Sequence, residues 1–245
     1  MIGFIVQARL GSTRLPNKII LPFYDGKSIF ELLLDKLLAF DNIKCIVATT
    51  LDPVNDKLET ICENYGVSCF RGDENDVLKR FIDAAEYFDV DGIIRVCSDN
   101  PFLNVPAMEE LISKVSTSKM DYISFNVSGT PSIKTHYGFW TEYVTTSCLK
   151  KVESLTTETL YREHVTNYIY SHPESFEIEW IQVPDIILEN KNVRLTIDTK
   201  DDFESAQTMY SEIDDKNSFY DIFSYIREHK AIAQSMLNQI EANTK

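Results

Sequence analysis

The sequence predicts an α/β fold in which a mostly parallel central sheet carries helices on both of its faces. Three observations lead to this prediction. Short apolar runs alternate with segments of helical periodicity along the first half of the chain. Those runs are continuously apolar, which is typical of strands that are covered on both faces. A length of 245 residues suits one large domain, and a chain of this size can bury a core without disulfides.

The first half of the chain supplies the expected parallel strands and the helices that connect them. Strands are expected at residues 2–6, 44–50, 67–70, 91–97 and 121–125. Helices are expected at residues 28–39, 53–64, 74–88 and 106–117. The second and fourth helices begin with prolines, Pro53 and Pro106, which suit a first helical turn. Sheets of this kind bind ligands at the carboxyl ends of their strands, so a functional site is expected in the loops that follow them.

The pattern changes after residue 125. The remaining elements are expected as an extended segment at 136–144, a helix at 156–172, strands at 176–183 and 193–197, a helix from about 200, and an amphipathic helix at 219–240. The sequence predicts one domain over residues 1–212 and a helical tail at 213–245. Residues 126–183 are a candidate acceptor-binding or dimerisation subdomain within that domain.

The charge and the cysteine content argue against several classes of protein. A formal net charge of −14 is unlike a nucleic-acid-binding protein, which needs a basic face. The five cysteines are odd in number and include no CxxC pair, so they are expected to be reduced core thiols. The sequence shows no signal peptide and no apolar run of the roughly 18–20 residues that a membrane span requires. We therefore expect a cytoplasmic protein without a membrane or nucleic-acid partner.

The stretch QARLGSTRLPNK at residues 7–18 collects three cations and no acid directly after the first predicted strand. It fits neither glycine-rich phosphate motif, because it has a single glycine and because the GKS at residues 26–28 lacks the upstream glycine of a P-loop. Phosphates could instead be held by the three cations, Arg9, Arg14 and Lys18. Three small residues, Gly11, Ser12 and Thr13, would let a phosphate approach the loop closely and could donate hydrogen bonds to it from backbone N–H groups and hydroxyls. The alternative is that these residues are only three solvent-exposed cations on a polar surface loop.

The same stretch resembles the signature of the CTP-dependent sugar-acid cytidylyltransferases, which activate acylneuraminate and deoxy-octulosonate sugars. It is most similar to the spore-coat polysaccharide branch of that family. The pattern A-R-x-x-S-x-R-L-P-x-K is matched by Ala8, Arg9, Ser12, Arg14, Leu15, Pro16 and Lys18. The resemblance continues in the expected order through residues 70–81, 95–103, 162–170 and 195–203, and it fades after about residue 212. It implies a nucleotide-diphospho-sugar transferase-like fold, a homodimer, and a nucleotidyltransferase that uses CTP and Mg²⁺.

Two lone acids, Asp99 and Asp198, follow apolar runs of the sequence. Magnesium prefers oxygen ligands, usually one or two carboxylates together with phosphates and water. The resemblance implies that both acids hold the metal ion. From residue chemistry alone, Asp99 could instead start an Asp-Asn-Pro turn, and Asp198 could be an N-cap or near-cap acid of the helix that follows it. Asp201 and Asp202 are expected to be first-turn acids of that helix.

The resemblance also implies further binding residues. For the nucleotide these are Ala8, Ser98 and Arg71, in addition to the loop residues Arg9, Gly11, Ser12, Thr13, Arg14 and Lys18. Arg71 could instead be a salt-bridged surface arginine, and Asp73 could cap the next helix. For the acceptor the implied residues are Glu142, Arg162 and His164, and Arg162 could hold an acceptor carboxylate.

Two positions depart from the family pattern. Thr196 stands where related enzymes often have the first acid of a D-x-D, and Trp140 stands where the spore-coat branch has an aspartate two residues before Glu142. The first departure leaves one protein carboxylate at that motif. The second puts the identity of the acceptor in doubt.

The sequence therefore predicts transfer of CMP from CTP to a sugar or sugar-acid acceptor, with release of pyrophosphate, in surface polysaccharide biosynthesis. Arg9, Arg14 and Lys18 are expected to be the catalytic residues, because they can hold the phosphates and offset charge on the leaving pyrophosphate. Two alternatives stay open at this point. One is a glycosyltransferase with a similar nucleotide-binding fold, and the other is a nucleotide-binding partner protein without catalysis.

Overall fold

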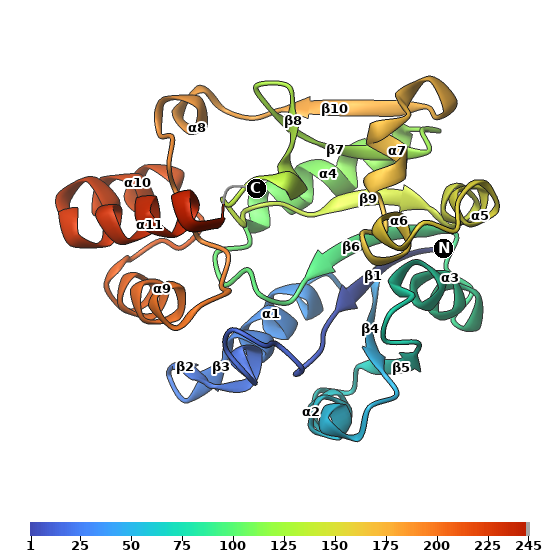
Figure 1. Cartoon of the computed structure of the whole chain (residues 1–245), viewed down its shortest axis with the longest axis horizontal. Helices are drawn as coiled ribbons and strands as arrows, with labels where there is room; N and C mark the ends of the chain where they lie inside the picture. The colour runs from blue at the N-terminus through green and yellow to red at the C-terminus, as the bar shows by residue number, and fades with distance from the viewer. Residues whose placement is uncertain (244–245) are drawn as a thin grey trace.

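The computed structural model describes residues 1–243 and is organised around one large sheet (Figure 1). The sheet has the strand order β10-β7-β9-β6-β1-β4-β5, and β8 pairs with β7 beside this path. Its strands are β1 (Ile2–Gln7), β4 (Lys44–Thr50), β5 (Ser68–Gly72), β6 (Gly92–Cys97), β7 (Tyr122–Val127), β8 (Thr130–Pro131), β9 (Glu142–Thr145) and β10 (Ile178–Gln182). A separate hairpin joins β2 (Pro22–Tyr24) to β3 (Lys27–Ser28).

The sheet is mostly parallel, as the sequence predicts. β1 runs parallel to β4 and β6, β4 to β5, and β10 to β7, whereas β9 is antiparallel to both β6 and β7. Gln7, at the carboxyl end of β1, lies opposite Ala48 of β4 and Cys97 of β6. The loops that follow β1 and β6 therefore leave the same edge of the sheet as neighbours. This is the edge at which α/β sheets of this kind bind ligands.

Helices cover both faces of the sheet. They are α1 (Ile29–Leu38), α2 (Asp56–Tyr65), α3 (Val77–Tyr87), α4 (Val105–Thr117), α5 (Thr146–Leu155), α6 (Thr159–Glu163), α7 (Asn167–Ser171), α8 (Asp185–Glu189), α9 (Lys200–Glu212), α10 (Phe219–Glu228) and α11 (Lys230–Asn243). Phe4 and Val6 of β1 pack in one cluster with α1, α2 and α4, whereas Ile5 packs in another with α3 and α5. The expectation from the continuous apolar runs, a sheet buried on both faces, is confirmed.

Capping residues determine where α1 and α3 begin. α1 begins after Ser28, whose hydroxyl accepts a hydrogen bond from Glu31 N–H while the Glu31 carboxylate accepts one from Ser28 N–H. α3 begins after Asp76, which accepts from Lys79 N–H, so the prediction that Asp73 caps this helix is wrong. Asp73 instead accepts from two backbone N–H groups of the turn that precedes the helix.

The expected strand at residues 193–197 does not form. The backbone there pairs with two loops instead of with a neighbouring strand. Leu195 N–H donates to the carbonyl of His136 at 2.8 Å, and Ile197 N–H donates to that of Asp99 at 3.1 Å. The segment is therefore extended without belonging to the sheet, and the second contact brings residue 198 beside the loop that follows β6.

The single helix expected at residues 156–172 is divided into α6 and α7. Between them, Thr166 donates its hydroxyl hydrogen to the buried carboxylate of Glu142 at 2.8 Å. This side-chain anchor lies at the break and ties the segment to β9. Helical periodicity could not reveal it, because it depends on a buried partner that is distant in the sequence.

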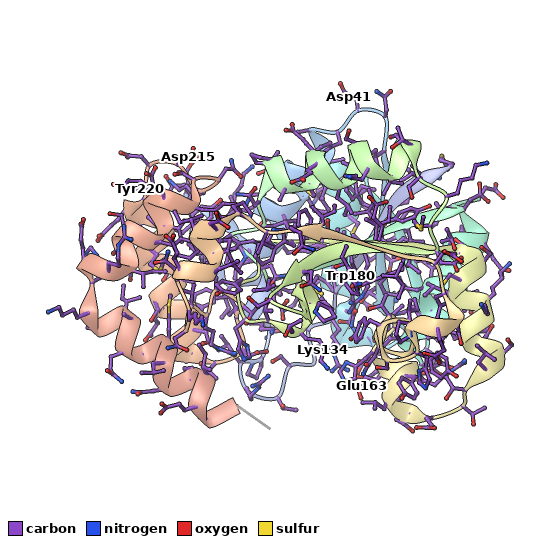
Figure 2. All side chains as sticks on the ribbon, turned by 90° about the horizontal axis from the view of Figure 1, so that it is seen from above. Asp41, Lys134, Glu163, Trp180, Asp215 and Tyr220 are labelled. Carbon is purple, nitrogen blue, oxygen red and sulfur yellow. The ribbon has the colours of Figure 1, made fainter. Side chains whose placement is uncertain are left out.

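The tail forms two helices, α10 and α11, instead of the one expected at 219–240. They meet at His229, although neither glycine nor proline marks a break. Phe223 and Met236 of the tail belong to the same buried cluster as Met209 of α9, so the tail packs on the core. Figure 1 shows α9, α10 and α11 stacked together, and Figure 2 shows Tyr220 at their outer surface. Within residues 1–243, no helix is long and apolar enough to cross a bilayer.

Candidate active site

Two adjoining cavities open at the carboxyl ends of β1 and β6. The first, which we call the loop cavity, has a volume of about 290 Å³ and is lined chiefly by the loop that follows β1. The second, the neighbouring cavity, has a volume of about 380 Å³ and is lined chiefly by residues of the segment 132–140. The two cavities share a wall, which consists of Arg95, Cys97, Asp99 and Asp198. The two acids that the sequence singles out therefore stand between two spaces.

The loop after β1 is anchored to a buried asparagine. Leu10 N–H donates to the side-chain oxygen of Asn55 at 2.8 Å, and Asn55 is 1 % exposed. Asn17 N–H donates to the carbonyl of Leu10, and a left-handed backbone at Asn17 (φ 60°) directs the chain into the turn at Lys18. The loop lines its cavity with the residues expected from the sequence, Arg9, Gly11, Ser12, Thr13, Arg14 and Lys18.

Lys18 lies between the two acids that are expected to hold a metal ion. Its Nζ is 2.9 Å from Oδ2 of Asp99 and 3.3 Å from Oδ1 of Asp198, and it also donates to the carbonyl of Ile197. Burial disfavours the charged form of Lys18, but the two carboxylates outweigh burial and raise its pKa above 10.5. Lys18 is therefore a permanent positive charge at the point where the two carboxylates meet.

Asp198 is surrounded by cations. In addition to Lys18, Nη2 of Arg14 lies 2.8 Å from its Oδ1, and Nη2 of Arg194 lies 2.8 Å from its Oδ2. Burial favours the neutral acid, but the three cations outweigh it and lower the pKa of Asp198 below 3.8. The carboxylate is therefore ionised at neutral pH, which is the form that binds metal ions.

The residues after Asp198 hold it in place. Thr199 and Asp202 form the capping box of α9, so Asp198 is not the N-cap of this helix but lies directly before it, as a near-cap acid would. Asp202, expected only as a first-turn acid, also accepts from Asp198 N–H at 3.0 Å and pairs with the buried Arg194 at 2.8 Å. The start of α9 thus orients both the backbone of Asp198 and the arginine that pairs with it.

The carboxylates of Asp99 and Asp198 have the chemistry of a magnesium site, because each directs an oxygen at the same cation, Nζ of Lys18. Two carboxylates, completed by phosphates and water, are a usual ligand set of Mg²⁺. Within residues 1–243, no group of three or more His, Cys, Asp or Glu side chains is arranged to hold a metal ion.

Comparison with known proteins identifies the family. A family model described as cytidylyltransferase matches residues 3–241. The chain belongs to the cytidylyltransferase family. It is 33% identical over 217 residues to the spore coat polysaccharide biosynthesis protein SpsF of Bacillus subtilis, across 86% of this chain and 87% of SpsF. It is 36% identical over 201 residues to an uncharacterized protein of Methanocaldococcus jannaschii, across 82% and 79% of the two chains.

A solved structure supports the same assignment. The cytidylyltransferase from Leptospira borgpetersenii superimposes with a TM-score of 0.78 and 30% identity, across 95% of this chain and 96% of that one. The resemblance seen in the loop after β1 is thus confirmed at the level of the family, and the nucleotide-diphospho-sugar transferase-like fold is confirmed with it.

The other residues expected at the nucleotide of this cytidylyltransferase are not all brought to the loop cavity. Ser98 lines it, and Ala8 is buried at the start of the loop. Arg71 does not line it, because its guanidinium is paired with Asp56 and Glu59 of α2 at 2.7 and 3.0 Å. Arg71 thus has the arrangement of the salt-bridged arginine that the sequence left open.

The structure does not bring Glu142, expected at the acceptor, to either cavity. Glu142 is 1 % exposed, and its carboxylate accepts from Nη1 of Arg95 at 2.6 Å, from the Thr166 hydroxyl at 2.8 Å and from the Tyr122 hydroxyl. Arg95 lines both cavities and also donates to the side-chain oxygen of Gln7 at 3.0 Å. In this structure Glu142 therefore holds Arg95 in the shared wall.

The two other residues expected at the acceptor differ in their positions. Arg162 is paired with Asp76 and Glu153 and lines neither of the two cavities. His164 does line the neighbouring cavity, together with Trp140. Of the three expected residues, the structure therefore places only His164 beside one of the two cavities.

Sequence reasoning missed several residues that line the cavities. Gln7, Arg95 and Cys97 lie at or near the carboxyl ends of β1 and β6, and that position alone could have singled them out. Burial raises the pKa of Cys97 to about 11, so its thiol is protonated at neutral pH. His136 lines the neighbouring cavity, and no sequence signal identified it; Thr196, which the sequence marked only as a departure from the D-x-D pattern, lines it as well.

Proposed function

We propose that this cytidylyltransferase transfers CMP from CTP to an oxygen of a sugar or sugar-acid acceptor and releases pyrophosphate, in the synthesis of a surface polysaccharide. The observation that supports this most directly is the meeting of two loop cations, Lys18 and Arg14, with the carboxylates of Asp99 and Asp198 at the wall between two cavities. The similarity to SpsF supports the polysaccharide context.

The nucleotide occupies the loop cavity, with its phosphates against Arg9, Arg14 and Lys18. Arginine binds phosphate oxygens through two parallel N–H donors, and lysine acts as a compact positive charge. Groups that are already held in place need no reorganisation when charge develops on the leaving pyrophosphate. The anchoring of the loop through Leu10 and Asn55 therefore contributes to catalysis by keeping these cations in position.

The acceptor occupies the neighbouring cavity, on the other side of Asp99 and Asp198. Its oxygen forms a bond to the α-phosphorus while the bond from the α-phosphorus to the oxygen bridging to the β-phosphate breaks. A hydroxyl acceptor releases its proton to water, and pyrophosphate leaves on the loop side. A shared wall between the two spaces suits this reaction, because the attacking and leaving oxygens must lie roughly in line.

Asp99 and Asp198 are the residues that would hold Mg²⁺. When bound, the ion neutralises phosphate charge and polarises an oxygen at the reacting centre. In this structure both acids contact the ammonium group of Lys18. A metal ion would therefore either compete with Lys18 for the same carboxylate oxygens or bind to the oxygens that Lys18 does not contact. We also propose that the protein is a cytoplasmic homodimer, which sedimentation velocity would test in the purified protein.

Two measurements on the purified chain test the proposed function. Thermal unfolding with each of the four nucleoside triphosphates and Mg²⁺ ranks their affinities, because a ligand of the folded state raises stability by RT ln(1 + [L]/Kd). Pyrophosphate release is then followed with CTP across a panel of sugars and sugar acids. We expect CTP to give the largest shift and at least one acceptor to give pyrophosphate. Preference for another triphosphate, or CTP binding without turnover on any acceptor, would contradict the proposal.

A further inference from the structure

A histidine that the sequence did not single out lies in the neighbouring cavity and contacts a buried arginine. Nη1 of Arg194 lies 2.8 Å from Nδ1 of His136. The same guanidinium donates through Nη2 to Asp198 and through Nε to Asp202, and its side chain is 1 % exposed. Arg194 is therefore held rigidly by two carboxylates, and its contact with His136 is fixed by the same geometry.

The contact with Arg194 determines which ring nitrogen of His136 carries the proton. A guanidinium has only N–H donors and does not lose its charge in proteins, so Nδ1 of His136 has to be the acceptor. An imidazole whose Nδ1 accepts a hydrogen bond is neutral and carries its hydrogen on Nε2. Burial, and then the charge of Arg194, lower the pKa of His136 below 6.5, although Asp198 and Asp202 partly oppose them, and this direction agrees with a neutral ring.

The Nε2–H group of His136 has no protein partner within residues 1–243, while the ring lines the neighbouring cavity. An N–H donor beside a cavity is satisfied by water or by an oxygen of a ligand. Lys134 also lines this cavity and is exposed at the surface, where Figure 2 shows it. The interior of the cavity thus offers a neutral donor at His136, separate from that exposed cation.

We propose that His136 binds the acceptor substrate, by donating the hydrogen of its neutral Nε2 to an oxygen of the acceptor in the neighbouring cavity. This inference rests on the proposed function, which places the acceptor there. The oxygen can belong to a hydroxyl, a ring ether, a carbonyl or a carboxylate, because all of these accept hydrogen bonds. Its Nε2 cannot serve as a general base in this state, since it already carries a proton.

Arg194 links this acceptor contact to the reaction centre. One guanidinium holds both the acceptor-binding ring of His136 and the carboxylate of Asp198. The position of the acceptor oxygen is therefore set relative to the carboxylate that is proposed to hold the metal ion. His164, the other histidine in the cavity, has no ring hydrogen bond within the described residues, so its orientation is not tied to Asp198 in this way.

The chain has four histidines, and two of them supply an internal standard for the tautomer. Nδ1 of His172 lies 3.0 Å from the carbonyl of Tyr168, and Nδ1 of His229 lies 2.9 Å from that of Tyr225. A carbonyl only accepts hydrogen bonds, so these two rings carry hydrogen on Nδ1. Nitrogen-15 NMR of the ring nitrogens near neutral pH should therefore show His136 with the opposite tautomer, and its signals are assigned by their loss in His136→Asn. A charged ring at His136, or one protonated on Nδ1, would overturn the inference.

Two substitutions distinguish the role of Nδ1 from that of Nε2 of His136 in a kinetic test. His136→Asn keeps an oxygen near the position of Nδ1 to accept from Arg194 but removes the Nε2 donor. His136→Gln can place an amide N–H near the position of Nε2. Because one hydrogen bond contributes about 1 kcal/mol, we expect His136→Asn to raise the acceptor KM about 5- to 10-fold at unchanged CTP KM, and His136→Gln to recover part of this loss. His172→Asn, outside both cavities, is the matched control.

Each outcome of this experiment has one meaning. Thermal unfolding with and without CTP first establishes that the variants fold and bind the nucleotide. An unchanged acceptor KM in His136→Asn, in an enzyme that turns over, would overturn the role of His136 and leave the proposed function intact. A wild-type enzyme that releases no pyrophosphate with any acceptor would instead overturn the proposed function, and this inference with it.

Discussion

Replacing Lys18 by methionine tests whether its ammonium group holds the two carboxylates together. The substitution keeps much of the apolar stem but removes the contacts with Asp99, Asp198 and the carbonyl of Ile197. The side chains of the two acids are 31% and 26% exposed, so water compensates part of the loss. From about 1.5–3 kcal/mol for a hydrogen bond to a charged group, we expect the variant to lose about 2–3 kcal/mol of unfolding free energy. For a chain of this size that corresponds to a fall of about 5–10 °C in Tm.

Magnesium should reverse part of this loss in the variant. Without the ammonium group, Asp99 and Asp198 no longer share a cation, and a divalent ion binds there without competing with Lys18. Binding to the folded state stabilises it in proportion to the logarithm of ion concentration over Kd. We therefore expect MgCl₂ without nucleotide to raise the Tm of the variant by several degrees more than that of the wild type.

Thermal unfolding in EDTA and in MgCl₂ measures both effects. Lys27→Met is the matched control, because Nζ of Lys27 lies 2.7 Å from Asp35 in an ion pair that is exposed on both sides. Such a solvent-exposed pair contributes little to stability, and its loss should create no response to magnesium. A Lys18→Met protein as stable as the wild type in EDTA, or an equal response of both to magnesium, would refute the reasoning.

Three further predictions concern the acids around the shared wall. Asp99→Asn should lower pyrophosphate release by roughly 10²–10³-fold in a protein whose melting curve shows an intact fold, and near-wild-type turnover would contradict the role of this acid. Glu142→Gln should cost about 3–5 kcal/mol in urea unfolding because it leaves Arg95 buried without its anion, so an unchanged midpoint would argue against a buried pair. The charge of Asp198 stabilises the fold fully above the ordinary pKa of 3.8, and this contribution is lost as the pH falls through the lowered folded-state pKa. The difference in Tm between wild type and Asp198→Asn should therefore shrink from about pH 5 to about pH 2, whereas a constant difference would contradict the lowered pKa.

The alternation of apolar runs and helical patterns was enough to predict the sheet, its parallel core and the helices on both faces. These features follow from burial, which leaves a local pattern in each segment. The extended segment at 193–197 shows where this reasoning ends. Its apolar residues are buried as in a strand, but its N–H groups pair with His136 and Asp99 in loops, and hydropathy does not record which partner a backbone group finds.

The ion pairs of two charged residues show the same limit of reasoning from local sequence patterns. The sequence indicated that Arg162 and Glu142 could reach the acceptor, since both lie in motifs that the family shares. In the folded chain Arg162 is paired with Asp76, 86 residues away, and Glu142 with Arg95, 47 residues away. A charged side chain in the interior is stable only beside a partner, and the partner is selected by the packing of distant elements.

By itself, the sequence determined the fold class, the family, and the loop and acids that meet at one edge of the sheet, because these leave local patterns and motifs in the chain. Only the tertiary structure decided that Lys18 joins Asp99 to Asp198, which lies 180 residues after Lys18 in the chain, and that Arg194 joins Asp198 to His136. Hydrogen bonds and ion pairs act over a few ångströms, so they depend on where the chain is brought together and not on the order of its residues.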